Sequence, residues 1–303
     1  MTLEEIPALG GLYLRGVAAS GRQGIAHGVG SLLGRPQGAA VPSLPPTTYV
    51  VPGVQVDADH LTTYQHLLGE AASDVLPAGY VHVLGFPLAM AVMVRTDFPL
   101  PLLGMVHLAN SVVQRRAVRL GDTLEVRAWA QHLAPHRSGT SVELVVEVAV
   151  EGDASSEPAW RGVSTYLAKG VRLHPGPPPE GEARAEVPTG APTGLWTLGA
   201  DVGRRYAAVS GDRNPIHLSG LAAKAFGFPR AIAHGMYTAS RALADVGVAR
   251  GETYRWDVAF DRPVLLPGAV TVRVVPAEDG TGFDYVGWSK ERVHLSGRVA
   301  PLR

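Results

Sequence analysis

The segment SGDRNPIH, residues 210 to 217, places a carboxylate and an imidazole five positions apart, at Asp212 and His217. An aspartate is ionised at neutral pH and a histidine titrates at about 6.5, so the pair offers a proton acceptor and a group that can either donate or accept a proton. Pro215 fixes its own backbone and restricts that of Asn214, which keeps the segment stiff. The residue types and their spacing therefore indicate an acid–base pair.

The same segment has a simpler interpretation, which is the start of a helix. Asn214 is a favoured N-cap residue and Pro215 is favoured at the first helical position. One helix through LSGLAAKAF would then end at Gly227. On this interpretation His217 is one more residue of the first helical turn, and the spacing alone does not choose between the two interpretations.

A second helix is predicted a short distance along the chain. The stretch AIAHGMYTASRALADV, residues 231–246, is typical of a buried helix entered through His234 and Gly235. The start of a helix presents unpaired N–H groups and a partial positive charge, and a glycine there lets a ligand carbonyl approach closely. We therefore expect an oxyanion-binding site at the start of this helix.

Taken together, these residues resemble the hydratase 2 motif of the MaoC-like family. The resemblance rests on Tyr206, on SGDxNPIH over residues 210–217, on AxGF over residues 225–228 and on IAHGM over residues 232–236. That family contains (R)-specific enoyl-thioester hydratases and (3R)-hydroxyacyl-thioester dehydratases. The resemblance implies a hydro-lyase that reversibly adds water, on one face, to a trans-2-enoyl thioester of coenzyme A or acyl carrier protein in fatty-acid or related lipid metabolism. The physiological direction and the chain length stay open.

The resemblance also implies a role for each polar residue of the first segment. Asp212 and His217 correspond to the catalytic pair of the family, and Asn214 and Ser210 are implied as supporting residues. The pair would hold one water molecule, aim it at C3 and deliver a proton to C2. Which member is formally the acid is left open, because a coupled pair titrates as a unit.

On the substrate side, the resemblance assigns the backbone N–H donor for the thioester carbonyl to Gly235. His234 and Met236 are implied as neighbours in the same oxyanion and substrate-binding site. One position departs from the family pattern, since members often carry an aspartate two residues after the histidine and this chain has Ser219. The departure concerns the tuning of the site rather than its chemistry.

The two halves of the chain also resemble each other. RAVRLGDTLEVR, residues 116–127, aligns without gaps on RPVLLPGAVTVR, residues 262–273, and Glu70 aligns with Asp212. The first half is eight residues shorter in the region that holds NPIH in the second half. We therefore expect only the C-terminal half to perform chemistry and Glu70 to be structural.

Each half shows one apolar helix followed by strands of alternating polarity. Residues 81–94 are apolar but too short to span a membrane, which favours a buried helix, and residues 141–151 alternate valine or leucine with glutamate. The resemblance implies an α+β double hot-dog fold, in which two tandem repeats each wrap an antiparallel sheet around a long apolar helix and form a pseudo-dimer. The expected domains are an N-terminal arm at 1–46, a degenerate hot-dog domain at 47–170, a linker rich in proline and glycine at 171–194 and the catalytic MaoC-like domain at 195–303.

Composition excludes several other classes of protein. Lysine plus arginine and aspartate plus glutamate both number 27, so no net positive charge favours nucleic acid. The chain has no cysteine, which excludes disulfides, thiolate nucleophiles and cysteine-based metal sites. The acidic start lacks the pattern of a signal peptide, so we expect a cytoplasmic protein with no membrane insertion. We also expect no metal and no cofactor, since the substrate is carried on coenzyme A or acyl carrier protein. The internal pseudo-dimer either suffices or pairs again as a homodimer.

Several residues outside the motif have weaker interpretations. Trp256, Trp288 and Phe260 lie in strand-like segments and are expected in the core. Five cations could meet the phosphates of the carrier, namely Arg213, Lys224, Arg230, Arg262 and Lys290.

Two other functions fit the same features. A hot-dog acyl-thioesterase would hydrolyse the same substrates with a carboxylate and an oxyanion site, without needing His217. A non-catalytic acyl-thioester-binding subunit is the second alternative, since one half already lacks the motif.

Overall fold

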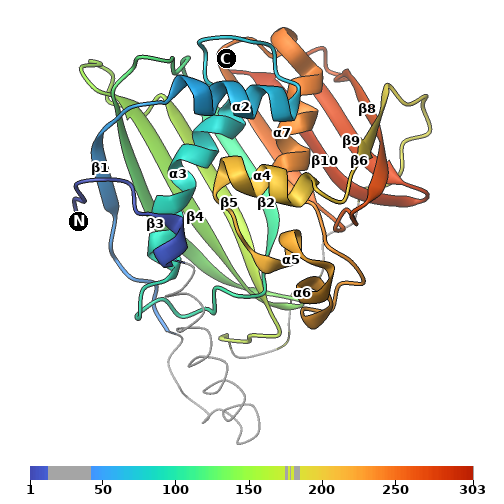
Figure 1. Ribbon diagram of the computed structural model, residues 1–303, viewed down its shortest axis with the longest axis horizontal. Helices are drawn as coiled ribbons and strands as arrows, with labels where there is room; N and C mark the ends of the chain where they lie inside the picture. The colour runs from blue at the N-terminus through green and yellow to red at the C-terminus, as the bar shows by residue number, and fades with distance from the viewer. Residues whose placement is uncertain (13–41, 175–176, 178, 181–184, 303) are drawn as a thin grey trace, which may run out of the picture.

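The computed structural model describes residues 1–12, 42–174, 177, 179–180 and 185–302, and over these ranges the strands form one ten-stranded sheet (Figure 1). The strands lie in the order β1-β3-β4-β5-β2-β7-β10-β9-β8-β6. Their bounds are Tyr49–Val54 (β1), Met105–Gln114 (β2), Leu124–His136 (β3), Gly139–Val150 (β4), Trp160–Lys169 (β5), Gly194–Leu198 (β6), Tyr254–Phe260 (β7), Gly268–Pro276 (β8), Phe283–Ser289 (β9) and Arg292–Pro301 (β10).

The sheet consists of two similar halves that meet in its middle. Strands β2 and β7 pair antiparallel in the register Ala109↔Ala259 to Gln114↔Tyr254, and this pairing joins the N-terminal five strands to the C-terminal five. Each half begins with the strand that ends up at its outer edge, β1 or β6. This internal symmetry agrees with the repeat in the sequence, and it places the two halves as two subunits of a dimer would lie.

Helices cover one face of the sheet, and the core lies between them and the strands (Figure 1). The helical segments are α2 Ala58–Leu68, α3 Ala78–Met93, α4 Val202–Ser210, α5 Pro215–Leu218, α6 Gly220–Ala225, α7 Gly235–Val246 and the 3₁₀ helix η1 Gly247–Arg250. Helix α3 packs on β3 and β4, and all its residues except Leu84 and Pro87 are buried. The apolar run at residues 81–94 is therefore confirmed as a buried helix, because a helix apolar on every side must be covered on every side.

The predicted strands are present, and their polarity agrees with their surroundings. In β4 the side chains of Val142, Leu144 and Val148 are buried, whereas Glu143 and Glu147 lie on the half-buried face. Such alternation is expected where one face of a sheet covers a core and the other meets water. Strand β2, MVHLANSVVQ, does not alternate cleanly, because part of it borders a cavity, and the sequence did not predict it.

The helix predicted from Pro215 to Gly227 is wrong in one respect, because the structure divides it in two. Asn214 does cap α5, where its side chain accepts a hydrogen bond from the Ile216 N–H at 3.4 Å, and Pro215 is the first helical residue. Ser219 then adopts an extended conformation, ends α5 and caps α6 through its hydroxyl. A short serine side chain competes for backbone N–H groups, which explains the interruption.

The predicted N-terminal arm, including the glycines between residues 28 and 34, lies largely outside the described residues, as does part of the predicted linker. Within the ranges that the structure describes, no helix has the length and apolar character needed to cross a membrane.

Candidate active site

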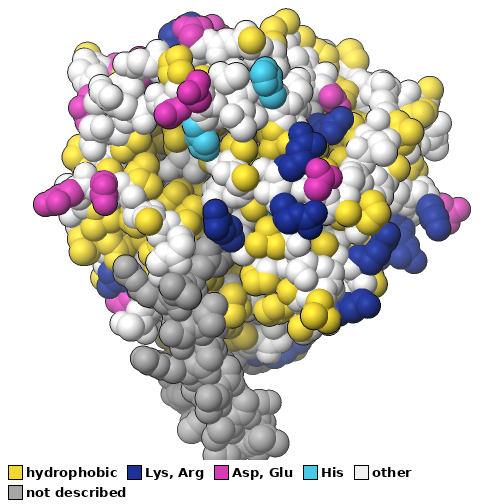
Figure 2. Space-filling model, viewed as in Figure 1, with side chains coloured by type: hydrophobic (Ala, Val, Ile, Leu, Met, Phe, Trp, Pro, Cys, Tyr) yellow, Lys and Arg dark blue, Asp and Glu magenta, His cyan; other side chains and the backbone are white. Residues whose placement is uncertain are grey.

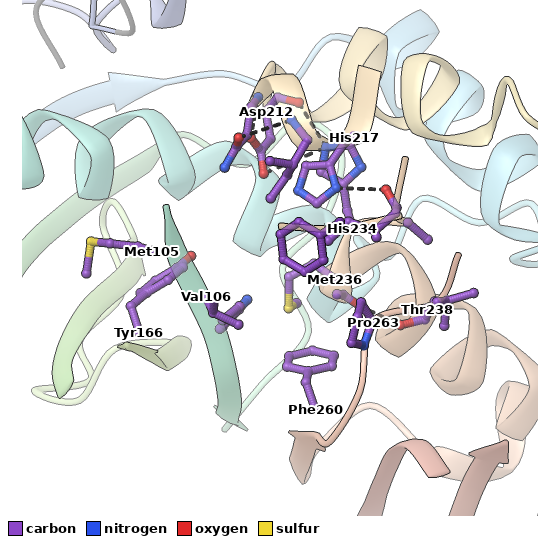
Figure 3. Close-up of a pocket in the computed structure, with 18 of the residues that line it drawn as sticks. Met105, Val106, Tyr166, Asp212, His217, His234, Met236, Thr238, Phe260 and Pro263 are labelled. Carbon is purple, nitrogen blue, oxygen red and sulfur yellow. Dashed lines mark hydrogen bonds and ion pairs between the residues drawn. The ribbon is translucent and has the colours of Figure 1, made fainter. Parts of the chain in front are cut away.

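A cavity of about 410 Å³ lies between the two halves, and every residue that the sequence placed in the site lines it. These residues are Ser210, Asp212, Asn214, His217, His234, Gly235 and Met236. They come from the end of α4, from the turn between α4 and α5, from α5 and from the residues at the start of α7. Figure 3 shows Asp212, His217 and His234 gathered at one end of the cavity, with Tyr166 and Phe260 farther along it.

Asp212 is held by the turn that follows α4. Gly211 adopts the left-handed conformation there, with φ of 71°, and ends the helix. The Asp212 N–H donates to the Ser210 hydroxyl at 3.2 Å, and the Asp212 carboxylate accepts a hydrogen bond from the Asn214 N–H at 3.1 Å. Ser210 is itself anchored, because its hydroxyl donates to the Tyr206 carbonyl at 2.8 Å. The carboxylate is thus oriented by its neighbours and keeps 23% of its side chain exposed.

His217 lies on α5 with one ring nitrogen committed to the backbone. Its Nδ1 lies 2.9 Å from the Ile232 carbonyl oxygen. A carbonyl only accepts, so Nδ1 carries the proton and donates it to that bond. Burial lowers the pKa of His217, and the neutral ring therefore keeps a lone pair on Nε2. His217 is thus a hydrogen-bond acceptor at Nε2.

His234 holds the loop of Asp212 in place. Its Nε2 donates to the Asp212 carbonyl at 2.9 Å and lies 3.8 Å from the Asp212 carboxylate. The rings of His234 and His217 stack with centroids 3.7 Å apart and planes 27° apart. Burial lowers the pKa of His234 to about 3, and the ring is therefore neutral. Its contacts make His234 a positioning residue for both members of the pair.

Gly235 begins α7 and lines the same cavity as the pair. As the first helical residue it has a backbone N–H outside the intrahelical hydrogen-bond pattern. A Cβ built on Gly235 would lie 3.1 Å from the ring of Phe260, so the ring packs closely against this backbone. Phe260 lines the cavity, which corrects its expected place in the core, whereas Trp256 and Trp288 are buried.

Side chains from the N-terminal half form another wall of the cavity, and the sequence did not predict them. This imidazole wall consists of His82 on α3, His107 on β2 and Tyr166 on β5. The rings of His107 and Tyr166 stack with centroids 4.5 Å apart. No motif marks these residues, because only the pairing of the two halves of the sheet brings them opposite Asp212.

One group in the described part of the chain has the composition of a metal site. The possible ligand atoms of Asp212, His217 and His234 all lie within 4.8 Å of one another. The two rings stack face to face, and each commits one nitrogen to a backbone carbonyl. The three residues thus form one stacked and hydrogen-bonded cluster.

Comparisons with known proteins agree with this geometry. Residues 181–291 match the MaoC like domain. The 3-hydroxyacyl-thioester dehydratase X of Mycobacterium tuberculosis is 34% identical over 262 residues, which cover 86% of this chain and 91% of that protein. The crystal structure of HtdX from the same organism matches with a TM-score of 0.73 and 33% identity, covering 84% of this chain and 100% of that one.

A third match concerns the fold alone. A protein of Mycobacterium tuberculosis described as having a double hot-dog fold matches with a TM-score of 0.51 and 14% identity, covering 83% of this chain and 93% of that one. Fold and site thus define a double hot-dog protein with an aspartate and two histidines at the junction of its halves. The chain belongs to the MaoC-like dehydratase family.

Proposed function

We propose that this protein interconverts (3R)-3-hydroxyacyl thioesters and trans-2-enoyl thioesters, with Asp212 and His217 as the catalytic pair. The observation that carries the proposal is the convergence of the Asp212 carboxylate and the His217 imidazole in one cavity, beside the start of α7. In this assignment residues 195–303 supply the catalytic pair, and residues 47–170 form a hot-dog unit that supplies part of the substrate cavity.

In the hydration direction, a water molecule held between Asp212 and His217 attacks C3. One O–H bond of the water breaks, and its proton passes to the pair as the new C3–O bond forms. The electrons of the C2–C3 double bond then take a proton back from the pair at C2. His217 Nε2 supports this assignment, because its lone pair is free of the backbone bond made by Nδ1. Dehydration is the same path in reverse.

The thioester oxygen gains negative charge during this step. The Gly235 N–H at the start of α7 would stabilise that charge, and one such donor contributes about 10²- to 10³-fold in rate. His234 would hold Asp212 in register with His217, and Met236 would contact the substrate beside it.

The carrier of the acyl group is coenzyme A or acyl carrier protein. Both present phosphate, and cations near the cavity support either one. Arg262 lines the cavity, while Arg213, Lys224 and Arg230 are exposed on or beside the loops that hold the site. Figure 2 shows lysine and arginine side chains gathered on the part of this face that includes α4 and α5. The chain has no cysteine, which suits a reducing cytoplasm, and we propose that location.

The test is to incubate the protein with trans-2-enoyl-CoA and to follow the loss of conjugation and the release of free thiol separately. We expect loss of conjugation without thiol release, and chiral analysis should give the (3R)-hydroxy product. Release of thiol without hydration would instead establish a thioesterase.

Two substitutions test the catalytic pair. Asp212→Asn and His217→Gln should each lower kcat by about 10²- to 10⁴-fold, because each removes a positioned acid–base group. Asp201→Asn and His66→Gln are matched controls, since both side chains are exposed and lie outside the cavity. Unchanged rates in both catalytic variants would show that the pair does no chemistry.

A further inference from the structure

The imidazole wall of His82, His107 and Tyr166 carries polar atoms, which are not needed to bind a pure hydrocarbon acyl chain. Apolar groups line acyl-binding pockets well, whereas a buried polar atom is costly unless it is hydrogen-bonded. The wall is partly covered: His82 belongs to the buried helix α3 and is 8% exposed, whereas His107 and Tyr166 are half-buried. The polar atoms of the wall that lack hydrogen-bond partners therefore indicate what the wall can bind.

His107 has one nitrogen with a partner and one without. Its ring is hydrogen-bonded by the backbone of Ala109, and this bond raises the pKa of His107, which is the direction expected when a carbonyl accepts. Its Nε2 is buried and has no hydrogen-bond partner among the described residues. Nδ1 therefore makes the bond to Ala109 and carries the proton. Burial lowers the pKa of His107 to about 3, so the ring is neutral and Nε2 carries a lone pair.

His107 lies close to the start of α7, where the proposed function places the thioester. Its ring lies 5.0 Å, centroid to centroid, from that of Phe260, and Phe260 packs against Gly235. The carboxylate of Asp212 also acts on His82 and His107 and raises the pKa of both rings against the effect of burial. His107 thus lines the same cavity as Gly235, with the ring of Phe260 next to both. If the large polar carrier stays toward the surface, the group that reaches this wall is the acyl chain.

We propose that His107 Nε2 accepts a hydrogen bond from a hydroxyl group on the acyl chain of the substrate, beyond C3, and that the protein prefers oxygenated acyl chains to plain ones. This inference rests on the proposed function, because it takes the chain of the same thioester into the same cavity. A hydroxyl satisfies the lone pair, whereas a methylene leaves it unpaired and buried. Sites built to bond a hydroxyl discriminate strongly against analogues that lack it.

The experiment compares trans-2-hexenoyl-CoA with its 6-hydroxy derivative. For the wild type we expect kcat/KM to be about tenfold or more higher for the hydroxylated substrate. His107→Phe keeps a ring of similar shape without the acceptor, and it should abolish this preference, so that kcat/KM becomes equal for the two substrates. His107→Gln returns a polar group at the ε position and should restore part of the preference.

Two further arms separate the alternatives. Tyr166→Phe keeps the stacked ring and His107, so the preference should survive in it. The N–H of a pantetheine amide could instead donate to His107 Nε2. Every substrate carries that amide, so in this case His107→Phe would slow both substrates equally. That equal loss, or a wild type without any preference, would overturn the proposal.

A binding measurement keeps the proposal independent of turnover. Hexanoyl-CoA and 6-hydroxyhexanoyl-CoA have no double bond to hydrate, and calorimetry should give tighter binding of the hydroxylated ligand to the wild type only. Equal affinities would overturn the hydroxyl site even if hydration occurs. Conversely, a difference in affinity without hydration would retain the hydroxyl site and refute the hydratase.

Discussion

Gly235 has little free space beside its backbone. The ring of Phe260 occupies the position beside its backbone, and a Cβ there would meet three ring carbons at 3.1 to 3.3 Å. These distances are closer than ordinary van der Waals contact, so either the ring or the start of α7 must move when a side chain is added. A glycine therefore fits this position because a side chain would displace the backbone N–H that is the proposed donor.

Gly235→Ala should lower kcat/KM by about 10- to 100-fold, because a displaced N–H no longer faces the thioester oxygen. Steady-state hydration kinetics measure the loss. Phe260→Leu frees space on the same side, so the double variant should recover part of the rate. A double variant as slow as Gly235→Ala alone would contradict the steric explanation.

Among the elements, the approach of α4 to α5 sets the place of His217. Gly203 on α4 is buried, and a Cβ built on it would overlap the carbonyl oxygen of His217. Backbone atoms cannot yield as the end of a side chain can, so a larger residue must push the two helices apart. The short helix α5 has four residues and depends on such packing for its position.

Gly203→Ala should therefore lower kcat by about 10²-fold and the free energy of unfolding by about 1–3 kcal/mol. Hydration kinetics and urea unfolding provide the two measurements. Gly220→Ala is the matched control on α6, since the nearest atom to its Cβ would be 3.8 Å away, an ordinary contact. A Gly203→Ala protein with the rate of the wild type would mean that α4 does not position His217.

Over the whole molecule, the two halves are tied by a buried ion pair at the place that corresponds to Asp212. Glu70, the aligned residue, pairs with Arg250 of the C-terminal half at 2.8 Å. The Glu70 side chain is 4% exposed, and burial raises its pKa. Glu70 is thus structural, as expected, and the first half carries an ion pair where the second half carries the site.

Arg250→Met should lower the free energy of unfolding by about 3–5 kcal/mol, because it leaves a buried carboxylate without a partner. Glu70→Leu combined with Arg250→Met should be more stable than Arg250→Met alone. Arg119 also joins the halves, by an exposed pair with Glu252, so Arg119→Met should cost about 1 kcal/mol or less. Urea unfolding compares the variants, and equal losses at Arg250 and Arg119 would refute this ranking.

The buried histidines make the stability of the whole molecule sensitive to acid. Burial lowers the pKa to about 4 for His82 and to about 3 for His107 and His234, and it lowers that of His217 as well. Each ring must stay neutral in the folded state, whereas the unfolded chain binds a proton below about pH 6.5. The stabilisation is complete above that pH and is lost as the pH falls toward the folded-state values.

As the pH falls from about 6.5 to 5, we expect the free energy of unfolding to decrease with a slope that approaches about 1.4 kcal/mol per pH unit for each of His82, His107 and His234. Urea unfolding at a series of pH values measures the slope. His107→Phe should reduce the slope by the contribution of one histidine, about 1.4 kcal/mol per pH unit. Ordinary carboxylates titrate below this range, so a flat profile would contradict neutral burial.

The sequence alone determined which residues of the C-terminal half gather in the cavity, since Asp212, His217 and Gly235 lie close together in the chain, at the turn after α4, on α5 and at the start of α7. It also determined the type of most strands and of the buried helix at residues 81–94, because alternation and continuous apolar character are local signals. The sequence did not predict the break at Ser219, because a serine that caps a second helix cannot be distinguished by sequence from a serine inside one continuous helix.

Only the tertiary structure decided what faces the catalytic pair. His82, His107 and Tyr166 are distant from the motif in sequence, and they meet it because β2 pairs with β7 at the centre of the sheet. No local pattern encodes such a pairing, since it depends on the packing of both halves at once. For the same physical reason, the partner of Glu70 became visible only when the fold placed Arg250 against it.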